Sequence, residues 1–159
     1  MKGTRPRTSA GLLMFRRRAG HIEVLLAHPG GPFFRNKDEG SWTIPKGEAE
    51  EGEDLRVRAH LEFQEEVGCA APADGWIDLG WIQQKGGKIV HAWGVEGDLP
   101  NDFKPFSNTF EMECPPRSGK RQAFPEVDRV EFFGTEEAAR KIKPTQRELL
   151  ERLASALER

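Results

Sequence analysis

The chain has 159 residues and a formal net charge of −2 at pH 7. This length supports one domain with an apolar core, and we expect a single domain over residues 1–159. The near-neutral charge gives no electrostatic basis for binding nucleic acid or a membrane surface. No apolar run approaches the roughly 20 residues of a membrane-spanning helix.

Cysteine usage and the N-terminus add two further expectations. Cys69 and Cys114 lack metal-ligand spacing, which favours reduced thiols in a cytoplasmic protein. Residues 1–7 are basic, and we expect them to be flexible; no long apolar segment of the kind found in signal peptides follows them.

Apolar periodicity and turn residues predict interleaved strands and helices. The expected strands are 8–15, 22–28, 76–84, 88–96 and 129–133, and the expected helices are 52–67, 135–141 and 144 to the C-terminus. Gly86 and Gly87 suit a hairpin turn between the third and fourth strands. Residues 97–123 lose periodicity and are long enough for a functional loop. The order of elements predicts an α/β fold, a mixed sheet covered by helices.

Three carboxylates crowd one turn of the first predicted helix. Glu62, Glu65 and Glu66 share a helix face, where like charges destabilise by roughly 0.2–0.5 kcal/mol per pair. A divalent cation would reverse that sign. Because the ligands are all oxygen, with no histidine or cysteine beside them, we expect Mg²⁺ or Mn²⁺.

A helical wheel separates this interpretation from a merely solvated acidic helix. An apolar arc at helical spacing contains Leu55, Ala59, Phe63 and Val67. Glu66 falls inside the edge of that arc, where an unpaired carboxylate would be costly. This placement, with the flanking glycines, favours a metal site.

The surrounding residues form a known motif. Residues 47–69 resemble the Nudix signature G-x5-E-x7-R-E-U-x-E-E-x-G-U, in which U is a bulky aliphatic residue. Six specific positions are kept, namely Gly47, Glu53, Glu62, Glu65, Glu66 and Gly68. Residues 42–48 and 124–133 are also similar to flanking strands of this family. The resemblance implies a Nudix-type α/β/α sandwich with a mixed β-sheet.

One specific position departs from the motif. Leu61 replaces the arginine that, in this family, orders the catalytic glutamates. Arg58 precedes Glu62 by one helical turn, so we hypothesise that it supplies the missing cation. The alternative is an ordinary surface ion pair between Arg58 and Glu62, worth tenths of a kcal/mol.

The resemblance also assigns roles within the motif. It implies that Glu62, Glu65, Glu66 and the Gly47 carbonyl bind the metal, that one of these glutamates acts as a base, and that Glu53 and Gly68 are structural. In some family members, a further acidic residue outside the motif acts as a metal ligand or as the base. Our first candidate for this catalytic residue is Glu126, and the competitors are Glu111, Glu113 and Asp128.

We expect the substrate contacts to come from residues that precede the first predicted helix. Lys46 adjoins the metal turn, where a phosphate contact competes with an ordinary solvated lysine. Aromatic rings offer faces on which a base stacks, although most aromatics in a domain are core. The expected substrate-binding residues are Lys46, Phe33, Phe34, Arg35 and Trp42.

Three functions from different classes follow. The first is a Mg²⁺-dependent pyrophosphohydrolase that cleaves a diphosphate linkage in a nucleoside or dinucleoside polyphosphate, a small-molecule partner. The second is a catalytically weakened nucleotide-binding protein, because of Leu61. The third is an interaction domain whose acidic helix binds a basic partner. Retention of all four motif glutamates favours the enzyme.

Overall fold

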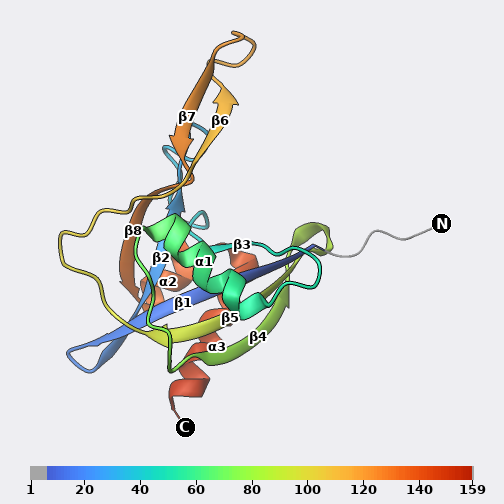
Figure 1. Cartoon of the computed structure of the whole chain (residues 1–159). Helices are drawn as coiled ribbons and strands as arrows, with labels where there is room; N and C mark the ends of the chain where they lie inside the picture. Colours follow the sequence, from blue (N-terminus) through green and yellow to red (C-terminus); the bar gives the residue numbers. More distant parts are fainter. Residues whose placement is uncertain (1–6, 159) are drawn as a thin grey trace.

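The computed structural model describes residues 7–158, in which strands and helices alternate along the chain (Figure 1). The strands are β1 (Thr8–Arg18), β2 (His21–Pro29), β3 (Lys46–Glu48), β4 (Ile77–Gln83), β5 (Ile89–Glu96), β6 (Thr109–Glu113), β7 (Arg121–Pro125) and β8 (Val127–Gly134). The α-helices are α1 (Leu55–Val67), α2 (Thr135–Lys141) and α3 (Arg147–Leu157), and the 3-10 turns are η1 (Lys85–Gly87) and η2 (Pro144–Gln146). No helix in this part of the chain has the length and apolarity needed to cross a membrane.

The main sheet is built around β1. Within residues 7–158 it has six strands, in the order β4-β5-β1-β2-β8, with β3 added beside β1. β1 runs parallel to β5, with Leu12 opposite Trp93, and antiparallel to both β2 and β3. β3 pairs with the first half of β1 and β2 with its second half, on the same edge. This register places Gly47 opposite Ala10, in the middle of the sheet.

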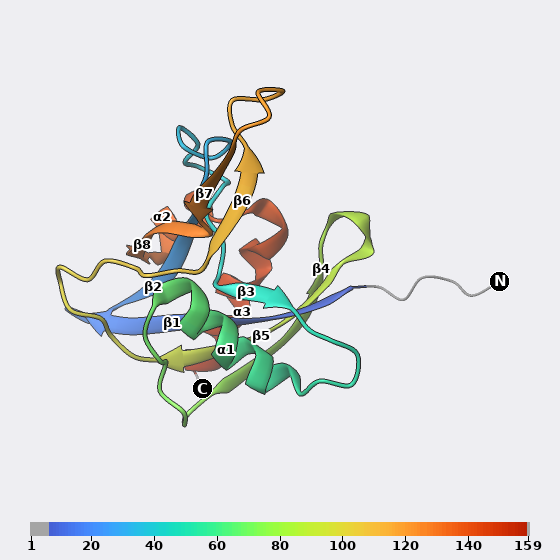
Figure 2. The ribbon, with the colours of Figure 1, turned by 45° about the horizontal axis from the view of Figure 1, so that its top comes forward.

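Alternating side chains of β1 supply one core on each face of the sheet. Leu12 packs in a buried cluster with Phe63 of α1, whereas Leu13 packs with Leu149 of α3 on the opposite face. Figure 2 shows α1 in front of the sheet, with α2 and α3 behind it. The fold is therefore the expected α/β/α sandwich with a mixed sheet.

The expected elements are present, with shifted ends. α1 begins at Leu55 rather than residue 52, because the Asp54 carboxylate accepts hydrogen bonds from the backbone N–H groups of Arg56 and Val57 and caps the helix there. The expectation of a flexible segment falls on residues 1–6, outside the described residues, and on Arg7. Arg7 is tied to the sheet, since its carbonyl accepts a hydrogen bond of 2.8 Å from the Ile89 backbone.

The expectation for residues 97–123 is wrong in its second half. There β6 and β7 form an antiparallel hairpin, with Phe110 opposite Phe124, that projects from the body as an arm (Figures 1 and 2). Two glycines without side chains, Gly30 and Gly31, allow the base of the arm to pack closely against the segment after β2. A Cβ on Gly30 would lie 1.9 Å from the Pro125 carbonyl oxygen, and one on Gly31 would lie 2.8 Å from the Phe110 ring. The arm is thus packed against the segment that follows β2.

Candidate active site

Both ends of α1 are fixed by specific caps, and these orient its acidic face. Asp54 caps the N-terminus, and Gly68 ends the helix in the left-handed conformation, with φ 98°. Between the caps, the Glu62 carboxylate lies against Gly47 of β3, and the charges of Glu62 and Glu65 act on Glu126, which precedes β8.

Gly47 allows β3 to approach this acidic face closely. A Cβ at Gly47 would lie 2.0 Å from the carboxyl carbon of Glu62, so any larger residue would displace that carboxylate. The glycine of the motif therefore leaves room for Glu62 in its present position. It brings the β3 backbone beside the Glu62 carboxylate, which fits the expected role of the Gly47 carbonyl.

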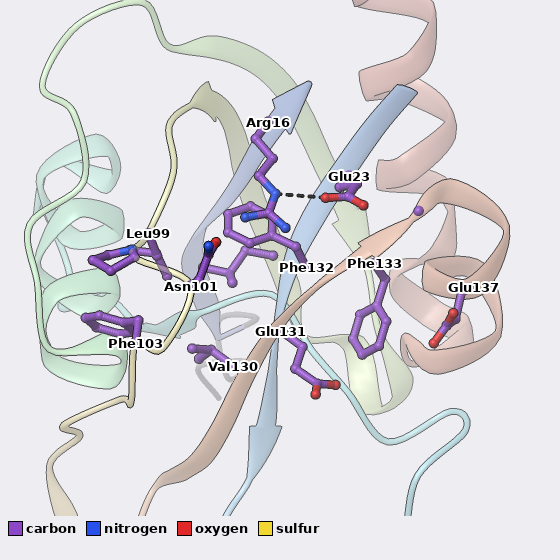
Figure 3. A pocket seen from close by; sticks show the side chains of 13 residues that line it. Arg16, Glu23, Leu99, Asn101, Phe103, Val130, Glu131, Phe132, Phe133 and Glu137 are labelled. Carbon is purple, nitrogen blue, oxygen red and sulfur yellow. Dashed lines mark hydrogen bonds and ion pairs between the residues drawn. The ribbon is translucent and has the colours of Figure 1, made fainter. Parts of the chain in front are cut away.

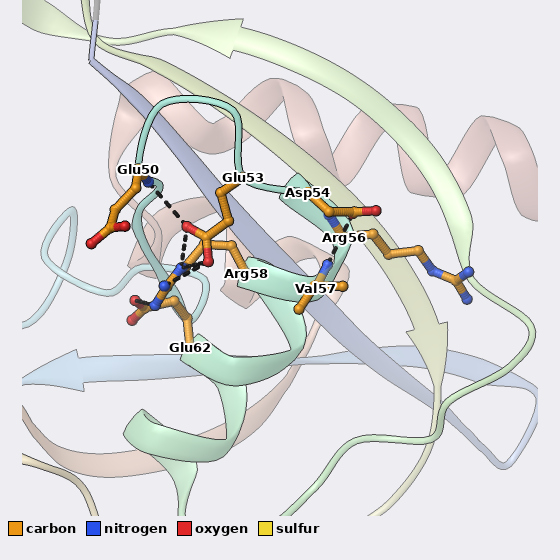
Figure 4. Close-up of polar contacts among 7 residues, drawn as sticks. All are labelled: Glu50, Glu53, Asp54, Arg56, Val57, Arg58 and Glu62. Carbon is orange, nitrogen blue, oxygen red and sulfur yellow. Dashed lines mark hydrogen bonds and ion pairs between the residues drawn. The ribbon is translucent and has the colours of Figure 1, made fainter.

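Arg58 bridges two motif glutamates, as Figure 4 shows. Its Nε lies 3.0 Å from both carboxylate oxygens of Glu53, one terminal nitrogen lies 2.7 Å from Glu53 Oε2, and the other lies 3.2 Å from Glu62 Oε1. The hydrogen bond from Arg58 lowers the pKa of Glu53, and that with Glu53 raises the pKa of Arg58. Glu53 also accepts a hydrogen bond from the Glu50 backbone, so it serves as a structural anchor for Arg58.

Glu66 is the buried member of the cluster. It is 7% exposed, and its Oε2 atom has no hydrogen-bond partner among the described residues. Burial first, and then the charge of Glu62, raises its pKa to about 9. A buried carboxylate oxygen without a partner is costly, and it marks the place where a ligand would complete the site.

Glu126 joins the cluster from the junction of β7 and β8. Burial, followed by the charges of Glu62 and Glu65, raises its pKa. The backbone holds it there: Glu126 N–H donates to the Asn108 carbonyl (2.8 Å), and Asn108 N–H donates to the Glu65 carbonyl (3.0 Å). The sequence gives no sign of this link through Asn108, which comes from an irregular segment.

The three competing acids point elsewhere. Asp128 accepts a hydrogen bond of 2.7 Å from the buried ring of His28. Glu111 lies on the arm, 3.7 Å from Arg121, and Glu113 pairs in register with the same arginine. The charges of Glu62 and Glu65, after burial, raise the pKa of Glu126, and this supports Glu126 as the further acid.

The side chains fit a hard divalent cation by their chemistry. Among residues 7–158, no three acidic, histidine or cysteine side chains are already arranged at metal-ligand spacing. Burial, followed by the charge of Glu62, instead raises the pKa of the Glu66 carboxyl. All the donors are oxygen, and Glu66 Oε2 is unpartnered, which suits Mg²⁺ or Mn²⁺.

Lys46 adds a positive charge at the edge of the cluster. Burial, followed by the charge of Lys143, lowers its pKa, while the carboxylates of Glu66 and Glu62 act in the opposite direction. The half-buried ammonium group therefore lies within electrostatic reach of both the carboxylates and Lys143. A wholly solvated loop lysine would not be desolvated in this way.

The expected substrate contacts divide into exposed and buried residues. Phe33 is 66% exposed and packs edge-on against Phe34, and the Lys37 ammonium lies 3.5 Å over its ring. Arg35 is exposed. The loop begins beside the cluster, since Gly30 N–H donates to the Glu126 carbonyl.

Trp42 does not fit its expected role. It is 1% exposed, and its ring packs edge-on against His28 and Phe133 in the core. Its indole N–H donates a hydrogen bond of 2.8 Å to Asp38 Oδ1. Because both faces are covered, Trp42 is a core residue and offers no surface to a substrate.

A NUDIX domain profile matches residues 5–153. The chain belongs to the Nudix family. It is also 31% identical over 87 residues to an RNA pyrophosphohydrolase of Caulobacter vibrioides, an alignment that covers 48% of this chain and 51% of that protein. The chain thus spans about half the length of the curated relatives it matches.

Two solved structures share the Nudix fold of this chain. The Ap4A hydrolase of C. elegans, as a binary complex, superposes with a TM-score of 0.65 at 23% identity, covering 94% of this chain and 98% of that one. The NUDIX domain of Shewanella oneidensis NrtR, complexed with ADP ribose, also gives 0.65, at 14% identity, covering 98% and 90%.

Proposed function

We propose that this Nudix protein is a divalent-metal-dependent pyrophosphohydrolase that cleaves a diphosphate linkage in a nucleoside or dinucleoside polyphosphate. The observation that carries the proposal is the buried, unpartnered Oε2 oxygen of Glu66, on whose carboxyl group the charges of Glu62 and Glu126 act. Such crowding is unfavourable unless a cation joins the carboxylates. The similar RNA pyrophosphohydrolase and Ap4A hydrolase support this class of reaction.

Each residue of the site has a role in the proposal. Glu62, Glu65, Glu66 and the Gly47 carbonyl hold Mg²⁺ or Mn²⁺, which when bound neutralises phosphate charge. Glu126 takes the proton from the attacking water, since its raised pKa makes it a stronger base than an ordinary carboxylate. Lys46 contacts a phosphate oxygen of the substrate.

The second candidate is a catalytically weakened nucleotide-binding protein, because Leu61 stands in the arginine position. The hydrogen bond from Arg58 to Glu62 favours the enzyme, since it supplies a cation to the same carboxylates. An interaction domain is disfavoured by burial. Glu66 is buried, so its carboxylate is not displayed to a basic partner.

The decisive test uses Glu65→Gln with a panel of substrates and either Mg²⁺ or Mn²⁺. The wild type should release a nucleoside monophosphate only with metal. The variant should keep its fold but lose most metal affinity and turnover, because one ligand charge is removed without a change of shape. Glu136→Gln, an exposed position on α2, is the matched control. Metal-independent activity, or full activity in Glu65→Gln, would overturn the proposal.

The exposed ring of Phe33 is proposed as the base contact. Phe33→Ala should raise KM for a nucleotide substrate far more than for inorganic pyrophosphate, since only the stacking contact is removed. Steady-state kinetics on both substrates provide the measurement. Equal effects on the two would assign Phe33 a packing role instead.

A further inference from the structure

One cavity of the structure is lined by three lysines. It has a volume of about 420 Å³ and lies between the turn joining β4 to β5 and the segment joining α2 to α3. We call it the lysine bay, and its polar lining consists of Gln84, Lys85, Lys88, Lys143 and Thr145.

The lysines of the bay are unpaired cations. Among residues 7–158, none of Lys85, Lys88 and Lys143 forms an ion pair, whereas Lys141 nearby in sequence pairs with Asp38. Lys143 is half-buried, and burial followed by the charge of Lys88 lowers its pKa. Partly desolvated like charges repel, and a bound anion would relieve that repulsion.

The bay is held rigid by a buried amide. Gln146 is fully buried: its Oε1 accepts a hydrogen bond from Ile44 N–H (3.0 Å), and its Nε2 donates to Gln84 Oε1 (3.2 Å). Thr145 Oγ1 reaches the same Gln84 oxygen at 3.3 Å, and Lys143 N–H donates to the Trp42 carbonyl at 2.8 Å. These bonds fasten the bay to the strand residues that lead into Lys46.

A short segment joins the bay to the carboxylate cluster. Gln146 accepts a hydrogen bond from Ile44 N–H, and Gly47, three residues further on, lies against the Glu62 carboxylate. On this segment, Lys46 feels the charges of Lys143 and Lys88 as well as those of Glu66 and Glu62. A chain of phosphates whose cleaved linkage lies at the carboxylates would pass Lys46 and enter the bay.

We infer that the lysine bay binds the part of a substrate phosphate chain that extends beyond the cleaved linkage, which makes this chain selective for extended polyphosphates over sugar-linked nucleoside diphosphates. The inference rests on the proposed function for the position of the cleaved bond. Lysine ammonium groups suit this ligand because they act as point charges along a run of phosphate oxygens.

A second basic residue, Arg16, is not available for the same purpose. Arg16 lines a different cavity of about 430 Å³, shown in Figure 3, where its guanidinium lies 2.8 Å from Glu23 and 3.9 Å over the Phe132 ring. A second bond of 2.8 Å joins it to Asp98. Glu131 and Glu137 also line that cavity. Its charges are thus satisfied internally, and its acids would repel a polyanion.

The test begins with binding in the absence of metal. Inorganic tripolyphosphate is titrated by calorimetry, in EDTA, into the wild type, Lys143→Ala, Lys143→Arg and Lys120→Ala. Loss of one lysine contact should weaken binding about five- to tenfold in Lys143→Ala. Lys143→Arg should recover most of the affinity, and Lys120→Ala, an exposed lysine of the arm, should bind as the wild type does.

Kinetics then relate the bay to the substrate. With metal, Lys143→Ala should lower kcat/KM for a dinucleoside tetraphosphate several-fold more than for ADP-ribose, which lacks an extended chain. Unchanged tripolyphosphate affinity, or equal losses for the two substrates, overturns the inference. If the wild type cleaves no phosphate anhydride while tripolyphosphate binding still depends on Lys143, the proposed function fails and the bay remains as an anion site.

Discussion

At the scale of single residues, the structure explains how the chain can lack the motif arginine at position 61, because Arg58 lies close to the same glutamates. Arg58 stands one turn before Glu62 and donates to both Glu62 and Glu53, whereas the Leu61 side chain is 40% exposed and carries no hydrogen-bond donor. Arg58→Ala should lower turnover on the order of ten- to a hundredfold, from the loss of about 1.5–3 kcal/mol in charge-assisted hydrogen bonding. Leu61→Arg in that background should restore part of the turnover.

Arg56→Ala is the control for this experiment. Arg56 lies on the same helix but reaches the Ala73 carbonyl (3.0 Å) and the Trp76 ring, away from the cluster. Its removal should leave turnover unchanged. The compensation idea fails if Arg58→Ala has no effect on turnover or metal affinity while Leu61→Arg alone raises both.

The sequence predicted those residues whose geometry is local. Helical spacing alone placed Glu66 at the edge of the core, and the structure shows it buried. Trp42 was misjudged because its partners, His28 and Phe133, come from distant strands that local spacing does not describe. Lys143 was missed for the same reason, since it meets Lys46 only when the segment after α2 packs against the sheet.

At the scale of elements, the C-terminal cap of α1 allows a test of how much the close contact between Gly68 and Phe106 matters for stability. Gly68 has φ 98°, and a Cβ there would lie 2.8 Å from the backbone N and O of Phe106. Gly52 has a similar φ of 79° with nothing within 4 Å. Gly52→Ala should therefore lower the free energy of unfolding by about 1–2 kcal/mol, and Gly68→Ala by roughly 1–3 kcal/mol more. Urea denaturation measures both, and equal losses would contradict a role for the Phe106 contact.

The arm is the element that sequence reasoning did not find. Its first strand does alternate, with Phe110 and Met112 between Thr109, Glu111 and Glu113, and this is a strand pattern. The prolines and charges around it concealed the pattern within a long irregular segment. The base of the arm also packs closely against Gly30 and Gly31, which are distant in sequence.

At the scale of the whole molecule, folding assembles the acidic cluster from three separate parts of the chain. β3 supplies Gly47, α1 supplies the helix glutamates, and the β7–β8 junction supplies Glu126. The favourable packing of two cores forces these like charges together. The stability of the metal-free protein should therefore depend on pH in a way that reports directly on the cluster.

Glu66 sets the sign of that dependence. Burial and the charge of Glu62 raise its pKa from an ordinary 4.5 to about 9, so the folded state holds this proton more tightly than the unfolded state does. Between these two values the folded protein binds more protons, and the free energy of unfolding in EDTA should fall as pH rises from about 5 to 9.

Glu66→Gln removes the titrating group and should flatten this slope, whereas Glu136→Gln should not. Mg²⁺ should reduce the slope in the wild type, because the cation stabilises the ionised carboxylate. An unchanged slope in Glu66→Gln, measured by urea denaturation across this range, would mean that the destabilising charge lies elsewhere in the molecule.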